Sequence, residues 1–214
     1  MNSDPRWLRY LEKHLPWLAL PRLAIVFITL QGLGFILTMS DSAWISRMAL
    51  IPQLAKTGEP WRLMTFMAVP LSMSPIWMIF SLWFLYYIFN LLESEWGAFK
   101  TTFYTFTSIL LTIAFSLTFN YPVFQISDFT STLFLAAAAL NPEQEVRIYM
   151  ILPVKMKYLG YLTLAYLGYR LFQGSWMDTF FLLTIYSNYL IFFGPVLLSQ
   201  VHQWQRRRNW RNRQ

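Results

Sequence analysis

The chain has 214 residues, of which 56% are hydrophobic and only 13% charged, and its net charge is +7. Soluble globular domains carry roughly 25% charged residues, so this composition predicts a polytopic membrane protein rather than a soluble domain. The absence of cysteine excludes disulfides, thiolate metal sites and a cysteine nucleophile. The positive charge gathers at the two ends, which indicates membrane orientation rather than nucleic-acid binding.

Six apolar runs follow one another, each bounded by charge, proline or glycine. They cover residues 21–39, 73–92, 101–120, 128–141, 158–173 and 177–200. A helix needs about 20 apolar residues to cross a bilayer, so the fourth and fifth runs are short. We expect a single all-α membrane domain over residues 1–214, built as a six-transmembrane-helix bundle. A four-span arrangement, with the two short runs in the membrane interface, is the alternative.

The two ends of the chain, at 1–20 and 201–214, are short basic tails. Six spans place both tails on one side of the membrane, and the positive-inside rule predicts that this side is the cytoplasm. The short termini and the lack of cysteine favour a bacterial inner membrane, or the endoplasmic reticulum membrane if the protein is eukaryotic.

The first loop, about 40–72, mixes apolar residues with cations. Trp44 and Met48 lie close to Arg47, and Trp61 precedes Arg62. This mixture predicts a short amphipathic element in the membrane interface.

Polar residues and glycines inside the runs have two possible roles. Amides could line a substrate groove or form interhelical hydrogen bonds, and we favour the second role. These amides are Gln31, Asn90, Asn120 and Asn188. Glu93, near the end of a span, is costly unless it is paired, so we expect a backbone amide or a basic partner for it. Close helix approach is expected at Gly32, Gly34, Gly160 and Gly168.

Three motifs carry a resemblance to a known family. The first is GEPWRLMT at 58–65, which contains Trp61 and Arg62. The second is a Leu-Glu pair that ends at Glu93, four residues before Gly97. The third is Asn-Pro at 141–142, followed by Pro153, Lys155 and Tyr158. Their order against the spans resembles the rhomboid-like superfamily, which includes the derlins. The resemblance implies a rhomboid-like six-helix bundle and marks these residues as a partner interface, a lipid interface or structural motifs.

Active rhomboids are intramembrane serine proteases that need a histidine base on the sixth span. This chain has only His14 and His202, at the two tails. The family's nucleophile motif falls on 128–131, where both glycines are missing and the nucleophile position holds Thr130, followed by Ser131. The catalytic histidine position falls on Asn188. The resemblance therefore implies a catalytically inactive, derlin-like member with no catalytic residues.

Asp128 lies beside Thr130 and Ser131, and such a group at a helix start predicts an N-cap. Chemistry at Thr130 or Ser131, as an atypical intramembrane protease, is the remote alternative. The sequence shows no metal-ligand cluster and no motif that binds a cofactor.

We therefore expect a protein that binds transmembrane segments or membrane-protein partners without cleaving them, in quality control, escort or retention. The amphipathic first loop, with Trp61 and Arg62, and the short fourth and fifth spans are together expected to thin the bilayer locally. A fixed structural or accessory subunit of a larger membrane complex is the alternative.

The polar connector at 141–159 separates the fourth and fifth runs. Its apolar residues are too many for a free loop, so we expect a partly ordered segment packed on the cytoplasmic face of the bundle. Arg147, Lys155 and Lys157 are expected at the lipid headgroups.

Overall fold

The computed structural model describes residues 6–148 and 152–211. A long helix forms at each of the six apolar runs, which confirms their number and order. These helices are α2 (Leu23–Ser40), α6 (Pro75–Trp96), α7 (Ala98–Phe119), α8 (Ser127–Leu140), α9 (Met156–Gln173) and α10 (Trp176–Arg211). Within the described residues, the segments Pro16–Ser40, Pro75–Trp96 and Ala98–Phe119 are long and apolar enough to cross a membrane, and α8 is a shorter apolar helix.

Local sequence explains where the helices begin and end. Pro75 lies in the first turn of α6, where its missing N–H is not needed. Gly97, with φ of 86°, forms the sharp turn between α6 and α7. Asn120 ends α7 in the left-handed conformation, with φ of 55°.

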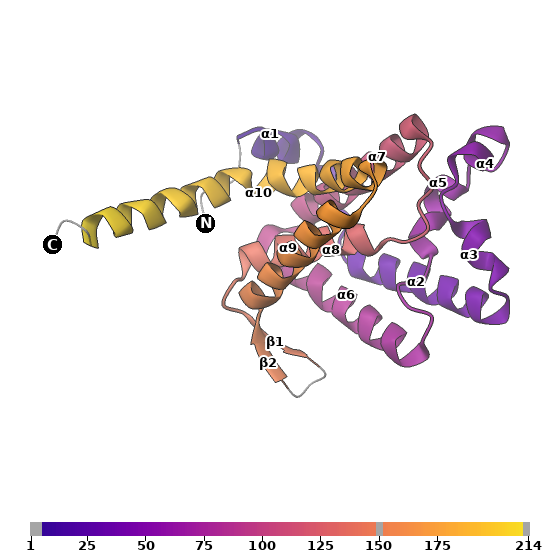
Figure 1. Ribbon diagram of the computed structural model, residues 1–214, viewed down its shortest axis with the longest axis horizontal. Helices are drawn as coiled ribbons and strands as arrows, with labels where there is room; N and C mark the ends of the chain where they lie inside the picture. The colour runs from indigo at the N-terminus through magenta and orange to yellow at the C-terminus, as the bar shows by residue number, and fades with distance from the viewer. Residues whose placement is uncertain (1–5, 149–151, 212–214) are drawn as a thin grey trace.

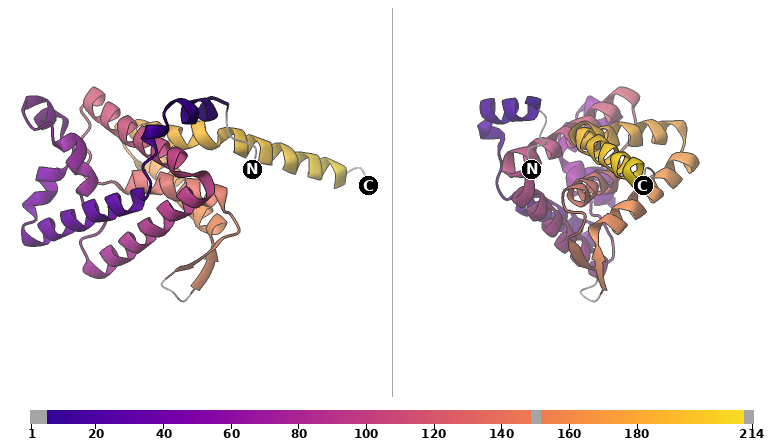
Figure 2. Two further views of the ribbon diagram at one scale, coloured as in Figure 1. Left: turned by 180° about the vertical axis from the view of Figure 1, so that it is seen from behind. Right: turned by 90° about the vertical axis from the view of Figure 1, so that its left-hand side faces the viewer.

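Short elements complete the fold. Before α2 lie α1 (Arg6–His14) and η1 (Pro16–Leu18); the first loop holds α3 (Ala43–Met48), α4 (Pro52–Thr57), α5 (Arg62–Thr65) and η2 (Phe66–Ala68). We call the end of the bundle with the first loop the loop end. The opposite end, where α1 packs against α7, is called the tail end (Figures 1 and 2). At the loop end, the first loop is joined to the α7–α8 connection by a β-bridge between Leu50 and Val123.

The short helix α8 lies inside the bundle. It packs against α6, α7, α9 and α10, and Leu133, Ala136 and Ala137 on it are fully buried. A helix enclosed in this way does not lie in the membrane interface, so the position of α8 supports six spans over four.

Close helix approach is confirmed at two of the four glycines. A methyl group at Gly34 would lie 1.7 Å from the carbonyl oxygen of Ala68, and one at Gly160 would lie 3.3 Å from the Ala138 side chain. Gly32 and Gly168 have no neighbour within 4 Å of such a methyl group, so the prediction was wrong for them. They lie on helix faces turned away from the packing contacts.

The amide side chains of Gln31 and Asn90 have different roles. Gln31 is fully buried and binds the backbone of the segment after η2: it donates to the carbonyls of Met67 and Val69 and accepts from the N–H of Leu71. Asn90 was expected to join helices but is exposed and donates to the carbonyl of Tyr86 in its own helix.

The connector forms a β-hairpin, which the sequence analysis did not predict. Strands β1 (Glu145–Ile148) and β2 (Leu152–Lys155) pair antiparallel, with Val146 opposite Val154. The hairpin projects from the bundle (Figure 1), so packing on the bundle is limited to its base, where Val146 is buried. Residues 149–151 lie outside the described residues. β-branched residues at 146, 148 and 154 favour strands.

Candidate functional site

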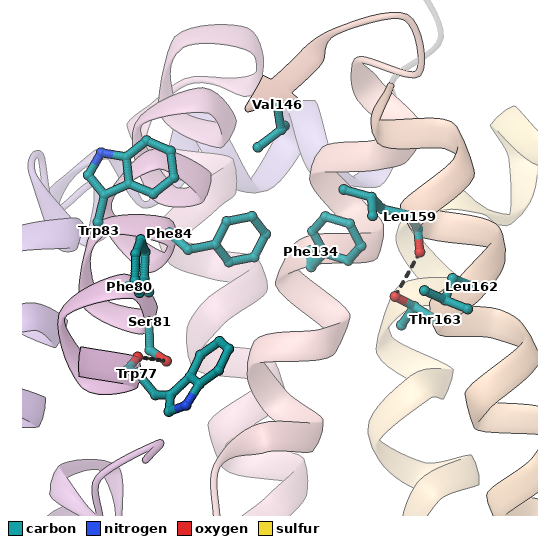
Figure 3. Close-up of a pocket in the computed structure, with 10 residues that line it drawn as sticks. All are labelled: Trp77, Phe80, Ser81, Trp83, Phe84, Phe134, Val146, Leu159, Leu162 and Thr163. Atoms are coloured by element: carbon teal, nitrogen blue, oxygen red, sulfur yellow. Dashed lines mark hydrogen bonds between the residues drawn. The ribbon is translucent and has the colours of Figure 1, made fainter. Parts of the chain in front are cut away.

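A groove opens on the side of the bundle between α6 and α9. It has a volume of about 400 Å³. Its walls are Trp77, Phe80, Ser81, Trp83 and Phe84 of α6, Leu159, Leu162 and Thr163 of α9, Phe134 of α8 and Val146 of β1 (Figure 3). Nearly all of this lining is apolar, and the hairpin residue Val146 closes the groove toward the connector.

A second cavity of about 260 Å³ adjoins the first. The two share Ser81, Phe84 and Phe134 as walls. The second cavity is also lined by Thr130 and Ser131, the residues that the resemblance to active rhomboids aligns with the nucleophile motif. We call the two cavities together the lateral groove.

The lateral groove is open to the side rather than to the ends of the bundle. Leu162 is 67% exposed, and Trp77 and Trp83 are also exposed. The polar groups of the larger cavity are satisfied locally: the hydroxyl of Ser81 donates to the carbonyl of Trp77 and that of Thr163 to the carbonyl of Leu159. A groove of this kind suits a hydrocarbon environment, where unsatisfied polar groups are costly.

Thr130 and Ser131 do not cap α8. Both hydroxyls donate to the carbonyl of Ser127, at 2.9 and 2.8 Å, and the N-cap residue Ile126 makes no side-chain cap. The predicted N-cap was therefore wrong. Asp128 pairs instead with the guanidinium of Arg170 on α9. The ion pair is favoured because a largely buried carboxylate without an opposite charge costs more free energy than a helix end without a cap.

Asn188, which the resemblance aligns with the catalytic histidine of active rhomboids, does not line the groove. It is fully buried, and its amide donates to the Tyr104 carbonyl at 3.0 Å and to the Ser108 hydroxyl at 2.6 Å. These bonds join α10 to α7, as an interhelical role predicts. The structure therefore does not bring Asn188 together with Thr130 and Ser131 in the groove.

The histidines lie far along the chain from the hydroxyls of the groove. His14 ends α1 at the tail end and hydrogen-bonds the carbonyl of Tyr10. His202 belongs to the last part of α10, and its side chain lies outside the described part of the structure.

A polar network at the loop end was missed in the sequence analysis. The hydroxyl of Tyr121 donates to the carboxylate of Asp178 at 2.5 Å, and Ser175 donates to the same carboxylate. Burial, with the hydrogen bond to Asp178, raises the pKa of Tyr121. The Asp128–Arg170 pair lies near this network. The sequence signal for the ion pair was the presence of opposite charges, Asp128 and Arg170, at the loop ends of the fourth and fifth apolar runs.

The Trp-Arg motif organises the first loop. Arg62 is only 5% exposed; it pairs with Glu59 at 2.6 Å and donates to the carbonyls of Ser46 and Ala49 at 2.6 and 2.9 Å. Arg62 thus ties α5 to the end of α3, so this part of the loop is a fixed structure rather than a free amphipathic element. Trp61 is 55% exposed and suits a lipid contact.

Glu93 and Gly97 join the tail ends of three helices. Both oxygens of Glu93 accept from the backbone N–H of Arg22, at 3.2 Å, which confirms the expected backbone partner. Arg22 precedes α2 in a left-handed conformation, with φ of 62°. Gly97 sets the turn to α7, and neighbouring Trp96 packs on Tyr104. Both family positions are structural.

The connector motif holds the base of the hairpin. Glu143 accepts from Lys155 at 2.8 Å and from Lys157 at 2.5 Å. These hydrogen bonds lower the pKa of Glu143 from 4.5 to about 2. Pro153, in β2, and Tyr158, at the start of α9, are both exposed. Lys155 and Lys157 were expected at headgroups and are paired with a carboxylate.

Comparison with known proteins gives one match. Residues 22–194 match the family model described as "Eukaryotic integral membrane protein (DUF1751)", a family in the rhomboid-like superfamily. No curated protein and no solved structure matches the chain. The eukaryotic description gives no support to a bacterial inner membrane. The match covers every helix from α2 to α9, including those that line the groove, and about half of α10. The chain is thus an integral membrane protein that belongs to the DUF1751 family of the rhomboid-like superfamily.

Proposed function

We propose that this protein binds a transmembrane helix of a partner membrane protein in the lateral groove and does not cleave it. The observation that carries the proposal is the position of the groove: it opens sideways between α6 and α9, with Leu162, Trp77 and Trp83 exposed at its walls. A ligand that reaches it through the bilayer is therefore favoured over a water-soluble ligand.

The chemistry of the walls suits a helix. Association of helices in lipid depends on close van der Waals packing, because lipid is as apolar as the side chains it surrounds. The larger cavity has aromatic walls and a floor at Phe134 of α8. Such a surface provides packing partners without charged groups that would need water.

The contacts of the candidate catalytic residues support the absence of proteolysis. Thr130 and Ser131 donate to Ser127, and the carboxylate of Asp128, the nearest acidic group in sequence, is held by Arg170. Asn188, at the expected position of the base, uses its amide N–H groups in hydrogen bonds to α7. A serine or threonine nucleophile needs a base within hydrogen-bond reach. Binding without cleavage suits escort, retention or quality control of the partner.

Local thinning of the bilayer belongs to the same proposal. The 14 residues of α8 span about 21 Å, against a hydrocarbon thickness of about 30 Å. Helix α9 has 18 residues and is about 27 Å long, so it is longer than the apolar run at 158–173 suggested. Because α8 is enclosed by other helices, the thinning is proposed where α9 and the groove face lipid, and it lowers the cost of bringing a short or polar helix there. An unthinned bilayer around the protein in nanodiscs, imaged by electron microscopy, would contradict this part.

We also propose that the tail end faces the cytoplasm, since the basic tails support that orientation. The cysteine-free chain allows single cysteines to report on it directly. A cysteine at Glu12 should react with a membrane-impermeant maleimide from the cytoplasmic side only, and one at Lys56 from the opposite side only. The reverse pattern would reject the orientation.

Photo-crosslinking in native membranes tests the binding function. A photoreactive residue at Leu162 should capture transmembrane proteins. The same residue at Leu110, which is 63% exposed on α7 outside the groove, is the matched control and should capture lipid. Several partners at Leu162 support escort or quality control, and one partner in fixed ratio supports an accessory subunit of a larger complex. Capture of lipid alone at both positions would reject helix binding.

The non-catalytic part is tested separately. Partners captured at Leu162 are reconstituted with the protein in proteoliposomes and followed by mass spectrometry. We expect no cleavage within the transmembrane segment. Cleavage that is lost in Thr130→Ala or Ser131→Ala would revive the protease alternative.

A further inference from the structure

The second cavity of the lateral groove contains a cluster of hydroxyl groups. Ser81 of α6 faces Thr130 and Ser131 of α8 across the cavity, and the remaining walls are Leu71, Phe84 and Phe134 among other apolar residues. All three hydroxyl residues are half-buried. We call Ser81, Thr130 and Ser131 the hydroxyl cluster.

The hydroxyl groups of this cluster act as hydrogen-bond donors within their own helices. A hydroxyl has one donor and two acceptor lone pairs. Ser81 donates to the carbonyl of Trp77 at 2.8 Å, and Thr130 and Ser131 donate to that of Ser127. The donors are thus used within the helices, whereas the oxygens keep acceptor capacity. The Tyr186 hydroxyl also lies against Ser131, so Ser81 and Thr130 hold most of the open capacity.

The cluster lies at a defined depth in the bundle. Thr130 is the fourth residue of α8 and Ser81 the seventh of α6, both counted from the loop end. At 1.5 Å per residue, these hydroxyls lie about 5–10 Å from the loop ends of their helices. The acceptors therefore face only the third of a docked helix that is nearest the loop end.

We infer that the lateral groove selects transmembrane helices that carry a hydrogen-bond donor side chain, such as asparagine, glutamine, serine or threonine, in the third nearest the loop end. This inference rests on the proposed function and names the class of partner. A donor facing hydrocarbon has no partner, whereas a donor facing the hydroxyl cluster finds an acceptor. A helix with such a donor is thus favoured in the groove by the difference in free energy between an unpaired donor in lipid and a hydrogen-bonded donor in the groove.

Model helices test the selection in proteoliposomes. Three leucine-rich transmembrane peptides are compared: one without a polar residue, one with asparagine in the loop-end third, and one with asparagine in the tail-end third. Capture by a photoreactive residue at Leu162 is measured against peptide concentration. We expect the loop-end asparagine to strengthen capture about threefold to tenfold over the all-leucine peptide, as interhelical hydrogen bonds do in membranes.

Substitutions assign the effect to the cluster. The double variant Ser81→Ala with Thr130→Val removes the two open acceptors and keeps side-chain size. It should reduce capture of the loop-end asparagine peptide to the level of the all-leucine peptide. Thr184→Val is the matched control, because Thr184 also donates to a carbonyl of its own helix and is half-buried on α10, outside the groove. It should leave the preference unchanged.

The outcomes separate the two proposals. Equal capture of the three peptides, or a preference that survives the double variant, overturns the selection and leaves helix binding in place. A preference for the tail-end asparagine also overturns it. Failure to capture any peptide at Leu162 rejects helix binding itself, and the selection with it.

Discussion

The first loop and helix α9 are held in opposite ways. The first loop is held by two buried side chains, Arg62 within it and Gln31 on α2, and each binds backbone groups of another segment. Helix α9 buries only Met156 and Gly160 among its residues, and its charged contacts lie at its two ends. Irregular backbone inside a membrane protein needs partners for its N–H and C=O groups, whereas a helix satisfies its own. The loop is therefore fixed by hydrogen bonds from side chains, whereas α9 is held by packing against α8 and by ionic contacts at its two ends.

The largest effect is expected at Arg62. Arg62→Ala removes a buried cation and leaves Glu59 and the carbonyls of Ser46 and Ala49 without it. We expect unfolding in bicelles to become easier by about 3 kcal/mol or more. Arg47→Ala is the control: Arg47 is exposed and stacks on Trp44, so its loss should cost less than about 1 kcal/mol. Equal effects of the two variants would mean that the loop is not fixed by buried polar groups.

Gly34 tests the same loop from the side of α2. In Gly34→Ala, the new methyl group would lie 1.7 Å from the carbonyl oxygen of Ala68, so η2 must move. Overpacking of this kind costs about 1–3 kcal/mol. Gly32→Ala, two residues earlier with open space around it, should be neutral or slightly stabilising because alanine favours helix. The comparison requires denaturation midpoints of both variants, and a neutral Gly34→Ala would contradict the close approach.

Gln31→Leu should have an intermediate effect. It removes three hydrogen bonds to the segment at 67–71 and leaves the carbonyls of Met67 and Val69 unpaired, which costs about 1–3 kcal/mol. Hydrogen exchange should accelerate at 67–71 and stay unchanged in α9. Asn90→Leu is the matched control, since its amide bonds only within α6 and is exposed. Protection at 67–71 that survives Gln31→Leu would show that packing alone holds the segment.

Helix α9 should respond differently. Asp128→Leu together with Arg170→Leu removes both members of the ion pair, so no unpaired charge remains in the bundle. We expect little change in global stability but a wider distribution of α6–α9 distances, measured by spin labels at Trp83 and Leu162. Labels on α6 and α7, at Trp83 and Leu110, should show no change. An unchanged α6–α9 distribution would show that packing on α8 fixes the wall without the ion pair.

The smallest effect concerns the hairpin base. The pKa of Glu143 is lowered by Lys155 and Lys157 from 4.5 to about 2, so its contribution is present above pH 4.5 and is lost as the pH falls toward 2. The protection factors of the amides in 144–148 and 152–156, which correct the exchange rates for their intrinsic pH dependence, should be higher at neutral pH and fall in acid. Glu143→Gln should show the lower protection already at neutral pH, without the acid-dependent change. Glu145→Gln, on an exposed residue of β1, is the control and should keep the acid-dependent change.

The helices could be predicted because their signal is local. Each apolar run is bounded by a breaker such as Pro75 or Gly97, and the chain needs no distant information to form a helix there. The family motifs likewise pointed to Arg62, Glu93 and Gly97 from short stretches of sequence. In the fold, Arg62 and Glu93 bind backbone groups and Gly97 forms a turn.

The groove and its polar neighbours could not be predicted, because they depend on distant segments. Asp128 and Arg170 are 42 residues apart, and their pairing requires α8 and α9 to lie side by side. The hairpin was missed because its strands are only four residues each and follow a polar turn. A cap for α8 was predicted from neighbours in sequence and was displaced by a partner from another helix.

The polar contacts that connect separate segments of this fold share one property: most join a side chain to a backbone group. Glu93 binds the N–H of residue 22, and Arg62 and Gln31 bind carbonyls of distant residues. Nearly any amino acid supplies these backbone groups, so such a contact restricts one position and leaves the other free to vary. Among related sequences, positions 31, 62 and 93 are therefore expected to be constrained individually, without correlated substitutions at the positions they bind. Methods that infer contacts from paired substitutions should recover the apolar helix packing of this family and miss the bonds that fix its first loop.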